Sequence, residues 1–367
     1  MMKNIKAQGF VLIDVDVVAL NNAGKNTQSN NDNAIATKSI RKNGRSYVYV
    51  SGQAWRYWWR EALQKNAGWN LSPITRDGKI AFTNADPLKF PDDDIFGYMR
   101  AAKDTLLDEN GEPVKDARGN TKMTNVTVTR VSPLKNSAII SAASVRPEQN
   151  WSSMSRQQGD AVPYEKQEYC AIMKGMFSLD LSMVGTFSNY DRTGYKNLSI
   201  VLQEEAIKDG AEEIDDPFVL DEKGNPKKLI RLAKGTREQR AKDTIQALKT
   251  ISGGAMQTNN MGDVTPKFII LASTNTGNHP FSHVVGGNKE RNDEEVIFNF
   301  DGLVEVLKDY KYTFDGSVFI GRRSGFMDEI STQLESLKTM SDIPVVKVLS
   351  VNEAIDQYCE QMKSQIE

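Results

Sequence analysis

The stretch from Arg45 to Leu63, RSYVYVSGQAWRYWWREAL, has the pattern of a short strand followed by a turn and an amphipathic helix. Its segment 47–50 alternates tyrosine with valine, which is typical of a half-buried strand. Ser51 is a favoured N-cap, because its hydroxyl can accept a hydrogen bond from an amide of the first helical turn. Trp55 and Trp59 lie four residues apart, on one face of the helix, and we expect both in the core.

The same helix carries a second, polar stripe. Gln53, Arg56 and Arg60 lie at steps of three and four, so they present their donors on one side. Between residues 38 and 60 the chain has six cations and no acid. Arginine forks and fixed amides suit a phosphate backbone, which favours a nucleic-acid contact. A core helix with a solvated face is the alternative, and it is the commoner structure for an amphipathic helix.

The composition is that of an ordinary globular protein, with 367 residues of which 39% are hydrophobic and 26% charged. The net charge is only −2, so no global field attracts the chain to nucleic acid. The charges are segregated instead: residues 203–222 hold nine acids and one lysine, and residues 223–242 hold eight bases and one acid. Such local surfaces fit a protein that binds nucleic acid and packs against its own copies, and the two stretches could meet across neighbouring copies.

Cys170 and Cys359 are the only cysteines, and the sequence shows neither a signal peptide nor an apolar run long enough to span a membrane. We therefore expect a soluble, cytoplasmic protein without a membrane partner.

Two strands are predicted, and a charged excursion from Ser188 to Lys234 follows the second. Phe10 to Leu20 alternates so that Val11, Ile13, Val15 and Val17 share one face, and Lys174 to Phe187 has the same alternation. The segment Asn21 to Asn33 is rich in asparagine and is predicted to be a mobile loop.

The C-terminal half predicts further helices and strands. Thr236 to Gln239 reads as a capping box that opens a helix, Lys267 to Ser273 as a buried strand, and Asn352 as the cap of another helix. Strand, helix, strand, excursion, helix and strand in this order indicate an α+β fold with insertions.

The chemistry of most enzyme classes is absent. No glycine-rich phosphate loop or nucleophile elbow is present. Pro280 between His279 and His283 argues against a shared metal site, and the run Asp92 to Asp94 is interpreted as solvated or capping. We predict no catalytic residue, no metal and no cofactor, and instead a scaffold that binds a single-stranded polyanion.

Several motifs together resemble one family. They are SGQAWRYWWREAL with the upstream GFVLIDVDVVALNNAG, then RVSPLKNS at 130–137, SLDLSMVG, ISGGAMQ before PKFIILAST, and GRRSGF at 321–326. In this order they resemble the DevR-type backbone subunit of type I-B CRISPR Cascade effector complexes, in the RAMP superfamily. The resemblance covers almost the whole chain, and SGQAWR is its most specific motif.

The resemblance implies a modified ferredoxin-like, RRM-like palm over residues 1–367, with a finger or web insertion at 68–150 and a thumb insertion at 186–234. It implies an antiviral ribonucleoprotein in which copies stack as a helical filament along the crRNA guide and support its pairing with a target DNA strand. Its other partners would be the large, small and crRNA-processing (5′-handle) Cascade subunits. The aromatic pattern of ordinary RNA-recognition motifs is missing, so we do not expect RNA to stack on the sheet.

A subunit that accepts any guide sequence must hold phosphates and riboses and leave the base edges free. We predict such contacts from two sets of residues. The first set is Gln53, Arg56 and Arg60 with Lys25, Arg41 and Arg45; the second is Arg130, Lys135, Ser137 and the amides of Gly253 and Gly254.

Two alternatives stay open. In one, the chain is like type III backbone subunits and cleaves target RNA with a metal at a loop aspartate, which would be Asp32. In the other, it is an assembly protein that does not touch RNA, and then its purified form shows no salt-dependent RNA binding.

Overall fold

A computed structural model describes residues 4–27, 29–106, 112–154, 158–190, 192 and 194–367. Its centre is strand β1, Lys6–Val18, which pairs antiparallel with β13, Val162–Asp180, on one side and with β17, Phe268–Thr274, on the other. Val11, Ile13 and Val15 face one hydrophobic cluster, while Phe10 and Leu12 face a second. The predicted strand is thus confirmed.

One residue of that strand departs from the predicted alternation. Val17 has a φ of 47° and is 56% exposed, because the register with β13 shifts between Val15 and Val18. Such a bulge turns the following side chains away from the core face.

The central strands have the ferredoxin-like connectivity. Helix α1, Gly52–Ala67, follows β1; then come β11, Ile139–Ser141, and β13, then helix α4, Lys234–Gln246, and β17. In space the order is β17, β1, β13, β11, and each pair of neighbours is antiparallel. A β-α-β-β-α-β chain with this order is the ferredoxin-like motif. The α+β prediction and its ferredoxin-like core are confirmed.

The sheet is extended at both edges and along β13. The added strands are β5, Arg45–Val50, and β4, Ser39–Lys42, at one edge; β20, Val318–Arg322, and β21, Val346–Leu349, at the other; and β10, Leu134–Asn136, against β13. Strand β5 leads directly into α1, whose first turn is capped by Ser51, since its hydroxyl accepts from the amide of Ala54. The predicted strand, cap and helix are all present.

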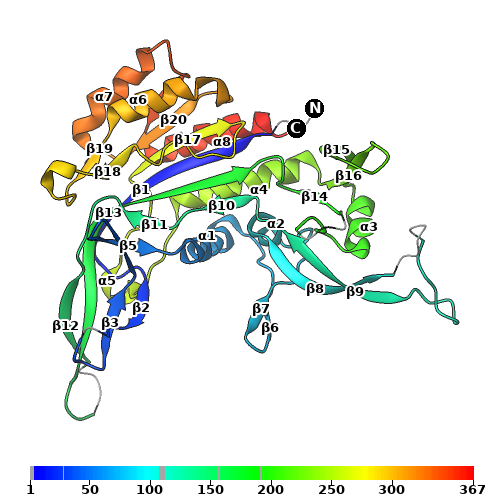
Figure 1. The fold of residues 1–367 in the computed structure, drawn as a ribbon, viewed down its shortest axis with the longest axis horizontal. Helices are drawn as coiled ribbons and strands as arrows, with labels where there is room; N and C mark the ends of the chain where they lie inside the picture. The colour runs from blue at the N-terminus through cyan, green and yellow to red at the C-terminus, as the bar shows by residue number, and fades with distance from the viewer. Residues whose placement is uncertain (1–3, 28, 107–111, 155–157, 191, 193) are drawn as a thin grey trace.

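Helices cover both faces of the sheet (Figure 1). Helices α1, α4 and α8, Val351–Gln365, pack on one face and form the larger cluster of buried side chains. The second cluster lies on the opposite face, under α6, Phe300–Asp309, α7, Ser331–Ser336, and the hairpin of β18, Val285–Gly287, and β19, Val296–Phe298.

Two predicted helix starts are wrong, that of α4 by three residues and that of α8 by two. Helix α4 begins at Lys234 after Ala233 and has no side-chain cap, so Thr236 to Gln239 is not a capping box. Helix α8 is capped by Ser350, which forms a capping box with Glu353, and not by Asn352.

Three arms project from the sheet (Figure 1). One consists of two hairpins around a short helix: β6, Thr75–Asp77, with β7, Ile80–Phe82; α2, Pro91–Phe96; and β8, Tyr98–Thr105, with β9, Met123–Arg130. The second holds β14, Thr186–Ser188, α3, Ile200–Lys208, β15, Glu212–Leu220, and β16, Pro226–Arg231. The third joins β12, Glu148–Met154, to the outer part of β13, with β2, Asn22–Lys25, and β3, Ala34–Thr37.

One predicted insertion range contains an observed arm, and the other extends beyond one. The second arm falls within 186–234. The range 68–150 is too long for one insertion, because β10 and β11 belong to the core sheet. The third arm was not predicted, and the segment 21–33, expected to be a mobile loop, contributes β2 to it. Residues 28, 107–111, 191 and 193 of these ranges lie outside the described residues.

Candidate nucleic-acid interface

Helix α1 turns its tryptophans inward. The ring of Trp59 is fully buried, lies edge-on to Phe177 with centroids 5.1 Å apart, and donates from Nε1 to the carbonyl of Thr244 at 2.7 Å. Trp55 stacks against Trp59 with centroids 5.4 Å apart. The prediction that both tryptophans belong to the core is confirmed.

The guanidinium of Arg56 is used inside the molecule. Its Nη1 donates to the carbonyl of Leu134 at 2.7 Å and to Oδ1 of Asn136 at 3.1 Å. Its Nη2 donates to the carbonyl of Phe96 at 2.7 Å and to Oγ of Ser132 at 2.9 Å. Burial lowers the pKa of this guanidinium to about 10. All four Nη donors are engaged, so Arg56 ties α1 to β10 and α2 and is corrected from a phosphate contact to a structural anchor.

Arg60, one turn further along, is only partly available. Its guanidinium lies over the ring of Phe96, 4.2 Å from the centroid, and its Nε is 3.9 Å from a carboxylate oxygen of Asp92. The side chain keeps 29% of its surface exposed. Burial lowers its pKa although the acids nearby raise it. Contact with RNA stays a prediction for this residue.

Arg130 is a buried anchor, contrary to its prediction as an RNA contact. Its side chain is 1% exposed and donates to Oδ1 of Asp94 at 2.5 Å. Further bonds reach the carbonyls of Met183 at 2.6 Å and Thr186 at 2.9 Å. Arg240 of α4 donates to the other carboxylate oxygen of Asp94 at 2.8 Å. The acids 92–94 are all buried and hydrogen-bonded, so their interpretation as solvated is wrong.

The start of α1 and strand β10 share an exposed polar edge. Gln53 and Lys135 are exposed, and Asn136 connects their elements by donating to the carbonyl of Gly52 at 3.1 Å. Ser137 next to them donates to the carbonyl of Ala138 at 2.7 Å and accepts from the amide of Met176 at 3.0 Å. The exposed Gln53 and Lys135 can reach a ligand directly, whereas the hydroxyl of Ser137 already has two partners.

The glycine pair 253–254 is required by packing. A Cβ on Gly253 would lie 2.2 Å from the ring of Trp58, and Gly254 has a φ of 114°. Two methionines that bound the next short helix, α5, Gln257–Asn260, also have left-handed backbones: Met256 at 57° and Met261 at 44°. Left-handed non-glycine residues are strained, and such strain is often found where a loop binds a ligand.

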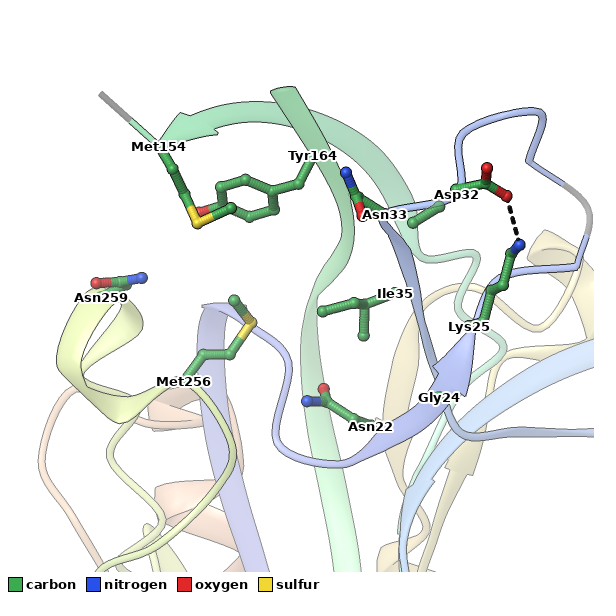
Figure 2. Close-up of a pocket in the computed structure, with 11 residues that line it drawn as sticks. Asn22, Gly24, Lys25, Asp32, Asn33, Ile35, Met154, Tyr164, Met256 and Asn259 are labelled. Atoms are coloured by element: carbon green, nitrogen blue, oxygen red, sulfur yellow. Dashed lines mark hydrogen bonds and ion pairs between the residues drawn. The ribbon is translucent and has the colours of Figure 1, made fainter. Parts of the chain in front are cut away.

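An open pocket of 720 Å³ connects this strained segment with Lys25 (Figure 2). Met256 from the segment, Met154 and Tyr164 from the third arm, and Ile35 from β3 point into it. Amide side chains add polar groups to its walls: Asn22, Asn33 and Asn259. The structure therefore brings Lys25 to the same pocket as Met256 and Asn259, which follow the glycine pair in the chain, but Gly253 and Gly254 themselves do not line it.

Lys25 is exposed at this pocket but has an internal partner. Its Nζ lies 2.6 Å from Oδ1 of Asp32, and both side chains are largely exposed. The hydrogen bond from Lys25 lowers the pKa of Asp32. An exposed pair of this kind is weak, so either partner can exchange it for a ligand.

Arg41 and Arg45 lie apart from that pocket, on the β4–β5 hairpin. Arg45 is 3.7 Å from a carboxylate oxygen of Asp293, and Arg41 lines a separate, wider cleft. The exposed predicted contacts are thus divided among three places: the pocket at Lys25, the edge at Gln53 and Lys135, and the β4–β5 hairpin.

The structure keeps the two histidines apart. His279 is half-buried and its Nε2 lies 2.9 Å from the carbonyl of Gly9, whereas His283 is exposed. Burial lowers the pKa of His279 to about 4. Within the described ranges, no three histidine, cysteine or carboxylate side chains are grouped as a metal site would require. No helix of the same residues is long and apolar enough to cross a bilayer.

Comparison with known proteins places this geometry in a family. The family model "CRISPR-associated negative auto-regulator DevR/Csa2" matches residues 11–295, which span the palm strands β1, β13 and β17 and all three arms. The chain belongs to the DevR/Csa2 family. This confirms the resemblance at the level of the family. A search of curated proteins finds no match.

Two solved structures are similar to this DevR/Csa2 chain over nearly its full length. One is a chain described as "CRISPR RNA-guided surveillance complex", with 8% identity, a TM-score of 0.48, and 97% of this chain and 99% of that chain covered. The other is described as "CRISPR RNA-guided surveillance complex, pre-nicking", with 9% identity, a TM-score of 0.46, and 99% and 100% covered.

Three sets of residues in this DevR/Csa2 chain have roles that were not predicted from the sequence. Asp94 and Arg240 escaped prediction because their partners are distant in sequence. Met256 and Tyr164 carry no charge and so gave no binding signal. Lys174 could have been found, since it precedes the alternating strand GMFSLDLS and falls on the face opposite α1.

Proposed function

We propose that this DevR/Csa2 chain is the crRNA-binding backbone subunit of a type I CRISPR effector complex of the Cascade kind, subtype I-B. Copies stack along the guide spacer and support its pairing with target DNA, together with the other subunits of the complex. The chain acts as a scaffold and not as an enzyme. The family match over residues 11–295 is the observation that carries this proposal.

The pocket at Lys25 supports a guide path on the α1 side of the sheet. It combines one lysine, three amide side chains and an apolar wall with Tyr164. Amides and a lysine bind phosphate and ribose without selecting a base, and an aromatic or methionine surface accepts any ribose or base face. This combination suits a protein that must hold guides of any sequence.

The arms support stacking between copies. Each arm exposes large apolar side chains: Ile80 is 69% exposed, Trp151 66% and Phe218 65%. Exposed aromatic and aliphatic side chains of this size are typical of surfaces that a partner covers. Within one chain, part of the acidic stretch 203–222 and part of the basic stretch 223–242 pair as the hairpin of β15 and β16, in which Lys228 lies 2.5 Å from Asp215. Part of their charge is therefore neutralised within one chain.

The test is RNA content after co-expression with a CRISPR array and the companion subunits. The variant is Lys25→Glu/Lys135→Glu, which changes two exposed cations on the proposed path. The matched control is Lys338→Glu, a lysine with 42% of its side chain exposed and paired only with the neighbouring Glu335 among the contacts described. We expect a protected RNA of uniform length with wild type and control, and its loss with the double variant at unchanged circular dichroism.

Two outcomes would contradict the proposal. Absence of RNA from the wild-type complex would favour an assembly protein. Full RNA retention in the double variant would remove the guide from the pocket at Lys25 and from the edge at Lys135.

A further inference from the structure

A second, larger cleft lies on the opposite face of the sheet from α1. Its floor consists of β4, β5, β11 and β13, and residues 283–301 with the start of α6 form its other wall. Its volume is 1340 Å³. Sites for single small molecules measure about 300–1,000 Å³, so this cleft is large enough for an extended ligand.

Lys174 provides the central charge of this cleft. Its Nζ donates to the carbonyls of Ser282 at 3.0 Å and Val285 at 2.7 Å. An ammonium group has three donors, so these bonds to described residues leave one for a ligand. Burial and the nearby charge of Lys42 lower the pKa of Lys174. An anion between the two lysines would relieve their repulsion.

The cleft is also lined by further cations and by carboxylates. Arg41 and Lys289 are further cations on its lining. Of its carboxylates, Asp293 is already engaged: it accepts from the hydroxyl of Tyr47 and lies 3.7 Å from Arg45. The others, Glu290 and Asp301, are exposed to water. The floor strands therefore carry cations, and the uncompensated acids lie on the opposite wall; solvent screens the exposed charges of both signs.

Apolar side chains lie between these charges. Ile140 on β11 is opposite Lys174 in the ladder, and Ile297 on β19 is 43% exposed. A lining of spaced cations with apolar surface between them suits a chain of alternating phosphates and sugars better than a compact anion.

We propose that this cleft binds the phosphodiester backbone of a single nucleic-acid strand other than the guide. The inference rests on the proposed function in one respect, that the guide follows the pocket at Lys25 on the other face. The chain would then offer two separate paths for polyanions, one on each face of its sheet.

The experiment measures the affinity of the protein for a labelled single-stranded DNA of unrelated sequence. Binding is followed by fluorescence anisotropy at a series of salt concentrations. It uses the full chain alone and the complex loaded with guide. The variant is Lys42→Ala/Lys174→Met, in which methionine keeps the length of the buried stem. The variant Lys25→Glu serves as a matched change on the other face. Circular dichroism and thermal unfolding verify the fold of each.

We expect Lys42→Ala/Lys174→Met to keep its guide RNA and to bind the DNA roughly tenfold more weakly. The slope of log affinity against log salt should decrease by about 1.4 in magnitude, since each phosphate contact of a single strand contributes about 0.7. Lys25→Glu should reduce the guide content. In complexes that still hold a guide its DNA binding should be unchanged, because there the guide occupies the pocket at Lys25.

Three results would overturn the inference. Loss of guide RNA in Lys42→Ala/Lys174→Met would make the cleft part of the guide path. Unchanged DNA affinity and salt slope in that variant would exclude a strand from the cleft. Displacement of the DNA by excess AMP would identify a mononucleotide site. If the wild-type complex lacks guide RNA, the proposed function fails. The assay on the chain alone still tests whether the cleft binds a nucleic-acid strand.

Discussion

The carboxylate of Asp94 joins three parts of the chain. It accepts from Arg130 at the base of the first arm, from Arg240 on α4 and from the amide of Gly185 at the base of the second arm, at 2.5, 2.8 and 2.8 Å. Since Asp94 and both guanidinium groups are buried, the network fixes the two arms relative to the palm.

Asp94→Ala should therefore be strongly destabilising. It leaves two buried cations without their anion, and breaking a buried pair in this way costs about 3–5 kcal/mol. The free energy of unfolding in urea measures the loss. The control is Asp309→Asn at the exposed end of α6, which should stay within about 0.5 kcal/mol of wild type. A similarly small change for Asp94→Ala would mean that the arginines find other partners.

The sequence could not reveal these roles. The triplet 92–94 has the appearance of a solvated charge run, and the arginines that bind Asp94 are 36 and 146 residues away. Arg56 was predicted to face a ligand for the same reason. Its hydrogen-bond acceptors are two backbone carbonyls and two side chains, and all four lie 40 to 80 residues away in the chain. Burial of a charge depends on the partners that the fold supplies, and spacing within one helix does not contain that information.

The segment from Gly253 to Gly262 shows how one element depends on its neighbours. It packs on α1 through Trp58 and continues into α5, whose Asn260 donates to the carbonyl of Val17 and to the carboxylate of Glu168. This fixes the wall of the pocket to β1 and to the third arm.

Gly253→Ala tests that packing. The added methyl would overlap the indole of Trp58, and overpacking of this kind costs about 1–3 kcal/mol. Gly235→Ala is the matched control, because nothing lies within 4 Å of the added methyl and alanine favours the helix. Thermal unfolding should show a lower midpoint for the first variant and an equal or higher one for the second. Equal midpoints would show that the segment moves away from α1 at little cost.

Elements with a strong local pattern were predictable. Strands β1, β5 and β17 and helix α1 follow from alternation, helical spacing and the Ser51 cap, all of which act within a few residues. The starts of α4 and α8 were not. Helix α4 begins three residues before Thr236, at a position without a side-chain cap, and α8 takes Ser350 and not the nearby Asn352 as its cap, so the local pattern alone does not fix the first residue.

At the scale of the whole molecule, a rigid sheet supports exposed arms. Every residue of β17 is buried, whereas β6 is exposed throughout and β7 nearly so. The overall class was predictable from the order of elements, but the strand order was not, since it depends on pairings between residues more than 150 positions apart.

Hydrogen exchange should show this division. In the isolated chain, peptides from β6 and β7 should exchange in seconds to minutes, and those from β17 only through global unfolding. In the assembled complex the arm should gain protection and β17 should stay unchanged. Equal protection of both regions in the isolated chain would show that the arm is already covered there.

The central position of β1 also has a consequence for synthesis. Its two partners are encoded far downstream, and about 250 residues separate Val18 from the start of β17. At about 5–20 residues per second, the ribosome needs roughly 12–50 s to deliver that second partner. For all that time a 13-residue, largely apolar strand has an unpaired edge. The nascent chain must therefore be kept from aggregating until translation has passed residue 274.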